Sequence, residues 1–405
     1  MLTITWFVPG RIEVFGKHTD YAGGRSILAA SSQGITVSAS KPRGSDALGQ
    51  GQVLARSTAV PDPVRLAAGT SPGLPAGHWG NYVQATIDRL SSNFGAFDPA
   101  VIEVDSTLPL ASGMSSSSAF VCAVALALAD HADLWSRPEW AENIRDNLDL
   151  AAYLATIENG LDYKALPGTK GVGTFGGSQD HTAMLNCQDG RLGLFQFAPA
   201  QSLSDAPMPK DHTFVVAVSG VLAEKTGSAL ADYNNASSQV RNLLRLWNGH
   251  AGTSHTALAH ALQEDGAAQV LRELASKDPR LSERLTAYLT EMEQAIPAAF
   301  AALQAGNLEA FGQAADLSHR SADQHLKNQV SETNYLQETA RDLGAVAASG
   351  FGAGFGGSVW AMLPTAQAEN FSALWLERYL QRFPEHTSDA SVIVTPAGTA
   401  ARRLS

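Results

Sequence analysis

A serine-rich turn that runs directly into a long apolar segment limits the folds open to this chain more than any other feature. The turn spans residues 108–119 (LPLASGMSSSSA), and the apolar run 120–128 follows it. This pattern predicts a buried helix over 116–131. Backbone N–H groups and hydroxyls at a helix N-terminus attract anions, so the turn is a candidate phosphate cradle. A serine that simply caps the helix explains these residues equally well.

The turn differs from the two commonest phosphate-binding loops. No lysine follows Gly113, so the pattern is not the G-x-x-x-x-G-K-[ST] loop. It also lacks the G-x-G-x-x-G spacing that opens the helix of a dinucleotide-binding fold. A phosphate bound at this turn therefore requires a different fold.

Length and charge narrow the class of protein. A chain of 405 residues exceeds what one hydrophobic core usually supports, and we expect two domains, over residues 1–205 and 206–405. The formal charge of −11 argues against nucleic acid or an anionic membrane as a partner. A negatively charged substrate would therefore need a local positive site.

The expected location is the cytoplasm, and the expected state is a monomer or a weak dimer. The N-terminus lacks the basic and apolar regions of a secretory signal, and the apolar run 119–129 is shorter than the roughly 18 residues that span a bilayer. Only Cys122 and Cys187 are present, one in the predicted helix and one in a predicted strand. We expect both to be buried thiols, with no disulfide framework and no cysteine-rich metal site.

The order of the predicted elements indicates an α+β protein. Short β-rich segments (4–8, 12–15, 35–40, 53–56 and 101–105) alternate with helical ones (79–95, 116–131 and 139–156). After the Pro- and Ala-rich segment 199–211, a strand over 213–219 precedes a mostly helical stretch over 228–346. A strand (359–363), a helix (366–382) and a final strand (390–394) follow. We expect this second half to place helices on one face of an antiparallel sheet.

Two polar clusters are candidate sites. Residues 9–24 (PGRIEVFGKHTDYAGG) hold Arg, Glu, Lys, His, Asp and Tyr between glycines, and in an extended segment His18 and Asp20 would face the same side, which suits two sugar hydroxyls. Residues 171–182 (GVGTFGGSQDHT) place Asp180 behind a glycine pair. A carboxylate there could accept a proton from an attacking hydroxyl in phosphoryl transfer, or simply satisfy turn N–H groups. We expect His181 to be a structural neighbour.

A third segment, residues 350–358 (GFGAGFGGS), holds five glycines within its first eight positions. Glycine weakens helices and strands alike, so close approach of the backbone to a ligand or to another segment explains the run better.

In this order, the segments closely resemble the signature motifs of the GHMP small-molecule kinases, and among them the galactokinases. Residues 10–24 match the Gly-Arg…Gly-x-His-x-Asp-Tyr…Gly-Gly sugar motif, 109–119 match the phosphate loop, and 352–357 match the Gly-Ala-Gly-Phe-Gly-Gly motif. Tyr233-Asn234 resembles the galactokinase Tyr-Asn sugar contact. The resemblance implies two lobes, an N-terminal ribosomal-S5-like domain and a C-terminal ferredoxin-like domain, and an ATP- and Mg²⁺-dependent kinase for an anomeric hydroxyl.

The resemblance also implies roles for individual residues. Asp180 would be the catalytic carboxylate, and Arg11 would stabilise both Asp180 and the charge on the transferred phosphoryl group. Ser116 and Glu158 match the magnesium ligands. The residues that fall at sugar contacts are Lys17, His18, Asp20, Gly177 and Tyr233. The residues that would hold the nucleotide phosphates are Ser112, Gly113, Met114, Ser115, Ser116, Ser117 and Ser118.

The chain departs from the galactokinase pattern at two positions of the first motif. Lys17 stands where galactokinases carry a glutamate that contacts the O6 side of the sugar, and Glu13 stands where they carry an asparagine. One hypothesis is that Lys17 binds the carboxylate of a uronic acid such as galacturonate. The alternative is that Lys17 pairs with Glu13 and the substrate is a neutral hexose.

A further departure is the extra length between Glu158-Asn159 and Gly176, which could reshape the cleft or act as a lid.

A competing function is a non-catalytic regulator that binds sugar and ATP. Because Arg11, Ser116, Glu158 and Asp180 are all present, we expect catalysis.

Overall fold

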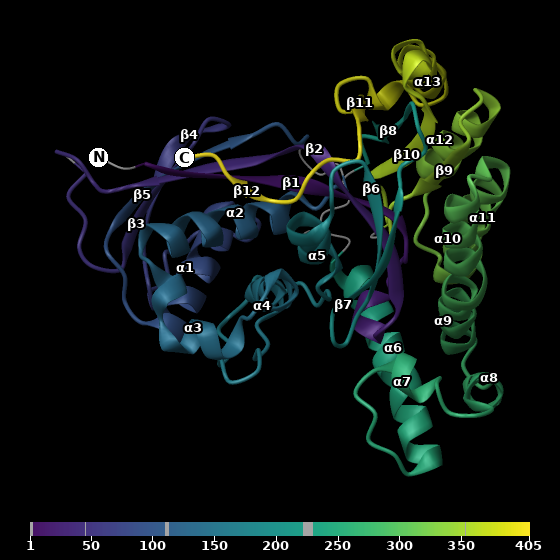
Figure 1. The fold of residues 1–405 in the computed structure, drawn as a ribbon, viewed down its shortest axis with the longest axis horizontal. Helices are drawn as coiled ribbons and strands as arrows, with labels where there is room; N and C mark the ends of the chain where they lie inside the picture. Colours follow the sequence, from purple (N-terminus) through teal and green to yellow (C-terminus); the bar gives the residue numbers. More distant parts are fainter. Residues whose placement is uncertain (1–2, 45, 110–112, 222–229, 353) are drawn as a thin grey trace.

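The structure is a computed structural model, and it describes residues 3–44, 46–109, 113–221, 230–352 and 354–405. In helix α6, side chains are described from Asn234 onward. Figure 1 shows two lobes side by side, with the first lobe built around a long sheet and the second around a helical layer and a smaller sheet.

The first lobe contains an eight-stranded mixed sheet. Its order is β12-β1-β2-β5-β3-β4, and β6 and β7 extend it from β2. Every pairing is antiparallel except the parallel β3–β5 pair. The strands are β1 (Ile4–Phe15), β2 (Arg25–Ser40), β3 (Gln52–Ser57), β4 (Val60–Ala67), β5 (Ala100–Ser106), β6 (Arg191–Gln196), β7 (Gln201–Pro207) and β12 (Arg402–Arg403).

Helices cover one face of this sheet, below it in Figure 1. Helix α2 (Ser116–His131) packs on β1 and β2 and is enclosed by its neighbours, so residues 118–129 are all buried. This burial on every side explains why its sequence is apolar throughout rather than amphipathic. The other helices of the layer are α1 (Gly80–Phe94), α3 (Pro138–Asn143), α4 (Asn147–Asn159) and α5 (Gln179–Asn186).

The second lobe contains a four-stranded antiparallel sheet with the order β11-β8-β10-β9. Its strands are β8 (His212–Val218), β9 (Ala347–Gly350), β10 (Ser358–Pro364) and β11 (Ser391–Thr395). Its longer helices are α6 (Leu230–Ala251), α8 (Ala267–Ala275), α9 (Pro279–Leu289), α10 (Ile296–Ala305), α11 (Leu308–Ser321), α12 (Ser331–Asp342) and α13 (Ala368–Arg382). The short α7 (Leu258–Ala261) follows α6, and π-helical turns η3 (Thr290–Ala295) and η4 (Ala322–Leu326) follow α9 and α11.

Helices cover both faces of this second sheet, not one as the sequence predicts. On one face, Val215 and Ala361 pack with Trp375 of α13. On the other, Trp360 lies 6.4 Å from Phe311 of α11 between ring centroids. Because both faces of β8 and β10 are covered, residues 214–218 and 359–363 form continuous apolar runs rather than an alternating pattern.

One strand spans the expected boundary between the two halves of the chain. The expected division between residues 205 and 206 falls inside β7, which pairs with β6 along its whole length. The chain also returns to the first lobe at its end, since β12 pairs with β1. Cys187 lies at the end of helix α5 rather than in a strand, although it and Cys122 are both buried free thiols as expected. No helix within the described residues is long and apolar enough to cross a membrane.

Candidate active site

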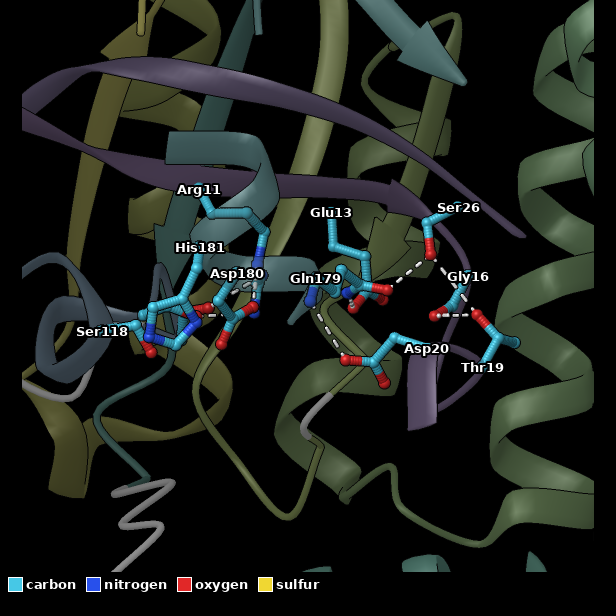
Figure 2. Close-up of polar contacts among 12 residues, drawn as sticks. Arg11, Glu13, Gly16, Thr19, Asp20, Ser26, Ser118, Gln179, Asp180 and His181 are labelled. Atoms are coloured by element: carbon cyan, nitrogen blue, oxygen red, sulfur yellow. Dashed lines mark hydrogen bonds and ion pairs between the residues drawn. The ribbon is translucent and has the colours of Figure 1, made fainter. Parts of the chain in front are cut away.

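A polar cavity lies where the sequence motifs converge between the two lobes. Its lining combines residues of β1 and the loop after it, the end of α4, the segment before α5, and the glycine-rich turn before β10. The lining residues are Arg11, Glu13, His18, Asp20, Tyr21, Ala155, Glu158, Thr174, Gly176, Gly177, Gln179, Asp180 and Gly352. Figure 2 shows the polar contacts among several of them.

Arg11 connects the carboxylate of Asp180 to the serine-rich turn. Its Nε donates to Asp180 Oδ1 at 2.7 Å, its Nη2 donates to Ser115 Oγ at 2.8 Å and its Nη1 donates to the Gly113 carbonyl at 3.2 Å. The guanidinium also lies 5.5 Å from the ring centroid of Phe351, in the glycine-rich segment. Only 2% of the Arg11 side chain is exposed, so its charge acts inside the protein rather than in bulk water. The three motifs therefore meet at one guanidinium.

The serine-rich turn has the geometry of a tight loop rather than of a simple helix cap. Helix α2 begins at Ser116, as the sequence predicts, but the Ser115 side chain makes no capping hydrogen bond and instead accepts from Arg11. Gly113 and Ser115 both adopt left-handed backbone angles, with φ of 67° and 58°. Ser112 lies outside the described residues. The cap interpretation therefore does not account for Ser115, and the turn places residues 113–118 at the start of a buried helix.

A second carboxylate, Glu158 at the end of α4, faces the start of α2. Ser118 Oγ donates to Glu158 Oε2 at 2.7 Å, and His181 Nε2 lies 3.4 Å from the same oxygen. Within the described contacts, the serine hydroxyl bonded to Glu158 is that of Ser118. It is not that of Ser116, which the family resemblance pairs with Glu158 as a magnesium ligand. A carboxylate beside a serine hydroxyl, at the edge of a polar cavity, is a donor set that suits a hard cation with several waters. His181 is buried, and its role as a structural neighbour stays a prediction.

The loop after β1 brings His18 and Asp20 to the cavity, but not as an extended segment. His18 has a φ of 55°, and Asp20 begins a short helical turn, η1 (Asp20–Ala22). The His18 Nδ1 and Tyr21 hydroxyl lie 2.7 Å apart, and Arg284 of α9 donates to the His18 carbonyl at 2.6 Å. Burial raises the pKa of Tyr21 to about 12, so its hydroxyl stays protonated. The tight glycine-flanked turn, not a strand, orients the two side chains.

Gly177 lies against Asp20 at a distance that only glycine permits. A Cβ added to Gly177 would lie 2.4 Å from Asp20 Oδ2, and the Gln179 N–H donates to that same oxygen at 3.2 Å. The segment before α5 therefore closes over the loop after β1. Gly177 and Asp20, which the sequence places far apart, therefore lie against each other, while their contact with a sugar stays a prediction.

Glu13 and Gln179 are site residues that the motifs alone do not reveal. Gln179 donates from its amide nitrogen to Glu13 Oε2, while Ser26 Oγ donates to the Gln179 amide oxygen at 2.5 Å. Glu13 Oε1 has no partner among the described residues, and a Cβ on Gly352 would lie 2.2 Å from it. Burial raises the pKa of the Glu13 carboxyl. In the sequence, the one sign that Glu13 has a place in the site is that galactokinases carry asparagine at this position.

The structure does not bring Lys17 to the cavity. Its side chain is 2% exposed and points into the second lobe, where Nζ donates to Ser318 Oγ at 2.7 Å and to Ser349 Oγ at 2.9 Å. The alternative of a Glu13–Lys17 ion pair is not formed either, because Glu13 turns to Gln179. The side chain of Tyr233, another expected sugar contact, lies outside the described residues.

The extra segment after Asn159 lies between two cavities. Thr174, Gly176 and Gly177 line the polar cavity, whereas Lys170, Gly171 and Val172 line a second one beside α1. Asn234 of α6 holds this segment to the second lobe, accepting from the Phe175 N–H at 3.2 Å and donating to the Gly173 carbonyl at 3.4 Å. Within residues 160–175, Thr174 thus lines one cavity and Lys170, Gly171 and Val172 line the other, while a reshaped cleft and a movement as a lid stay predictions.

Comparison with known proteins places this geometry in a family. Residues 81–165 match the model of the GHMP kinase N-terminal domain, residues 299–379 match the GHMP kinase C-terminal domain, and residues 2–41 match the galactokinase galactose-binding signature. The chain is 26% identical to a galactokinase of Thermococcus kodakarensis over 378 residues, covering 93% of this chain and 94% of that one. It is 24% identical to a galactokinase of Pasteurella multocida, covering 94% and 90%.

Solved structures show the same fold. A galactokinase from Lactococcus lactis, crystallised with galactose, superposes with a TM-score of 0.80 at 23% identity, covering 99% of this chain and 95% of that one. A mevalonate kinase from L. major gives a TM-score of 0.56 at 16% identity, covering 97% and 96%. The predicted two-domain α+β fold is confirmed, and the chain is a galactokinase-like sugar kinase of the GHMP family.

Proposed function

We propose that this kinase transfers the γ-phosphoryl group of ATP to the anomeric hydroxyl of a neutral, galactose-like sugar. The observation that carries the proposal is the buried guanidinium of Arg11, which bonds Asp180 on one side and the serine-rich turn on the other. An acceptor next to Asp180 and a phosphate on the turn would thus be neighbours across Arg11. Positioning and charge neutralisation are the main tools of phosphoryl-transfer enzymes.

In the proposed reaction, Asp180 orients the acceptor hydroxyl and accepts its proton. The sugar oxygen forms a bond to the γ-phosphorus while the bond from that phosphorus to the bridging oxygen of ADP breaks. Arg11 offsets the charge of Asp180 and the negative charge that spreads over the transferred group. The backbone of 113–118, at the start of α2, would hold the nucleotide phosphates.

Glu158 and Ser118 are the residues we assign to the magnesium ion, with Ser116 kept as the additional ligand that the family resemblance implies. Their oxygen donors suit Mg²⁺, which keeps much of its water when bound. The ion would neutralise phosphate charge when bound with ATP. Glu158 lines the cavity, and its Ser118 partner stands in the first turn of α2, so these two residues connect the acceptor side to the phosphate side.

The second cavity is our candidate for the base of the nucleotide. It is lined by residues of α1 and the turn before it, including Leu74, His78 and Tyr82. Tyr82 packs against Phe120 of α2, with ring centroids 6.5 Å apart, so this cavity adjoins the helix that begins at the serine-rich turn. A planar base bound there would pack against the side chains of Leu74 and Tyr82, next to the proposed phosphate position.

The charge of the polar cavity favours a neutral acceptor over a uronic acid. Its described lining contains the carboxylates of Asp20, Glu158 and Asp180, the Glu13 carboxyl, whose pKa burial raises, and one guanidinium, that of Arg11. Lys17 points away from this cavity and bonds Ser318 and Ser349. No described lysine therefore lines the cavity to pair with a substrate carboxylate. An anionic sugar would add a negative charge to an already acidic site.

A panel of galactose, glucose, galacturonate and glucuronate, assayed with ATP and Mg²⁺ by coupled detection of ADP, tests the proposal. We expect kcat/KM for galactose to exceed that for galacturonate by roughly tenfold or more, since like charges in a poorly solvated site repel by over 1 kcal/mol. A preference for either uronate would overturn the neutral acceptor. Binding of sugar and ATP without any turnover would instead indicate the non-catalytic regulator.

A further inference from the structure

Four buried polar side chains meet where the loop after β1 touches the second lobe. They are Lys17 of that loop, Glu291 of η3, Ser318 of α11 and Ser349 of β9, and all are buried. Lys17 Nζ donates to the hydroxyls of both serines, at 2.7 and 2.9 Å. Ser318 Oγ in turn donates to Glu291 Oε1. Lys17 and Glu291 are therefore linked through one serine hydroxyl.

Glu291 also holds the backbone of the same loop. Its Oε2 accepts from the Gly16 N–H at 3.2 Å, next to Lys17 itself. Gly16 has a φ of 108°, and a Cβ there would lie 2.2 Å from Ser26 Oγ, so the turn depends on glycine. His18 adopts a left-handed φ of 55°, which costs a non-glycine residue free energy. Such a loop keeps its shape only if its surroundings hold it.

The charge on Lys17 is compensated inside the protein. A lysine nine-tenths buried or more is stable in its charged form only with hydrogen bonds and an opposite charge nearby, and the two serines and Glu291 supply them. The adjacent His319 adds no second cation near neutral pH, because burial and Lys17 lower its pKa to about 4. Glu291 lies on a π-helical turn, an irregularity often found at functional sites.

We propose that Lys17 is a positioning residue: together with Glu291 it fastens the loop 16–20 to the second lobe, so that His18 and Asp20 face the acceptor sugar. This inference rests on the proposed function for the identity of the ligand. It differs from a substrate contact, because Lys17 acts on every acceptor alike through the loop and does not read the charge of the sugar. The nucleotide side is not part of this linkage, since none of the four residues lines the second cavity or belongs to the turn 113–118.

A double-mutant cycle on the full-length protein tests the inference, using Lys17→Met, Glu291→Gln and the two together. Each single change leaves one buried charge unpaired, whereas the double change removes both. We expect either single variant to raise KM for galactose by roughly tenfold or more, and the double variant to regain most of that loss. KM for ATP should stay within about twofold in all three. The free energy of unfolding should show the same coupling.

Ser349→Ala supplies a milder variant that keeps both charges and removes one acceptor of Lys17. It should fold, and it should raise KM for galactose by roughly twofold to fivefold. The matched control is the exposed pair Lys327–Glu283, with 2.6 Å between Nζ and Oε2. The cycle Lys327→Met and Glu283→Gln should show no coupling, since exposed pairs contribute little.

Two results would overturn the inference. One is strict additivity of the Lys17 and Glu291 changes in both unfolding and acceptor KM. The other is a Lys17→Met enzyme that loses activity on galacturonate alone while its KM for galactose is unchanged, which would make Lys17 a substrate contact. Failure of the proposed function is distinguishable, because the wild type would then phosphorylate no sugar while coupling in the unfolding free energy could still be measured.

Discussion

Replacement of Asp180 by asparagine should lower kcat by roughly 10²- to 10⁴-fold, the usual contribution of a positioned general base. Asparagine keeps the size of the side chain and can still accept a hydrogen bond from Arg11, so the fold and the ATP affinity should be retained. Only the ability to take the proton of the acceptor hydroxyl is lost. Single-turnover kinetics, with sugar and ATP affinities measured separately, would locate the defect in the chemical step.

Asp149→Asn is the matched control for this variant. Asp149 also pairs with a basic side chain, Lys164, at 2.6 Å, but it lies at the start of α4 and does not line the polar cavity. Its replacement should leave kcat within about twofold, because Asp149 does not line the cavity and an asparagine there can still accept from the Tyr163 hydroxyl. If the Asp180→Asn enzyme turned over as fast as the wild type, the role assigned to Asp180 would be wrong.

Replacement of Arg11 by lysine should lower kcat by roughly 10²- to 10³-fold, although the charge is kept. Arg11 uses three different nitrogens for Asp180, Ser115 and the Gly113 carbonyl, and an ammonium group on a flexible chain cannot reproduce this planar arrangement. The loss should appear mainly in kcat, since the role we propose for the guanidinium is to stabilise charge on the transferred group. Rapid-quench measurement of ADP formation gives this rate directly.

Arg56→Lys is the control for the Arg11 variant, because Arg56 forms an exposed 2.8 Å ion pair with Asp46 on the far part of the first lobe. That change should leave kcat unaltered. An Arg11→Lys enzyme with normal kcat and a raised KM for both substrates would assign Arg11 to ground-state binding rather than to catalysis.

The sequence predicts best where local chemistry decides the structure. Helix α2 begins at Ser116 and ends at His131 as predicted, because an unbroken apolar run leaves no other buried element of that length. The predicted helix over 139–156 is wrong in its continuity: α3 ends at Asn143, and α4 starts anew with Asp146 as its cap, accepting from the Asp149 N–H. That side-chain cap was readable in the sequence.

The sequence predicts no strand where β7 lies, because the residues of β7 carry no alternating apolar pattern. Most of Gln201–Pro207 is exposed, and the strand is held by pairing with β6 rather than by burial of an alternating face. The two strands form a local hairpin in which Gln196 pairs with Gln201, so the neighbouring strand rather than an alternating apolar face makes this segment a strand. Composition alone suggested a linker there.

The candidate site, too, is predictable from the sequence where neighbouring residues decide its structure, and not where distant residues decide it. Motif order predicts that residues 10–24, the serine-rich turn and the glycine-rich turn converge, and the contacts of Arg11 confirm it. The choice between Ser116 and Ser118 as the partner of Glu158 depends on the phase of α2, which four successive serines do not reveal. The direction of Lys17 depends on serines some 300 positions away, so no local pattern could predict it.

The most direct test of the central claim is the phosphorus NMR spectrum of a reaction that contains the enzyme, galactose, ATP and Mg²⁺. We predict that the γ-phosphate signal of ATP decreases while ADP and a sugar phosphate coupled to the anomeric proton appear, and that the Asp180→Asn enzyme forms this product at a small fraction of the wild-type rate. Consumption of ATP to ADP and inorganic phosphate alone, or a phosphate on another hydroxyl, would contradict the account.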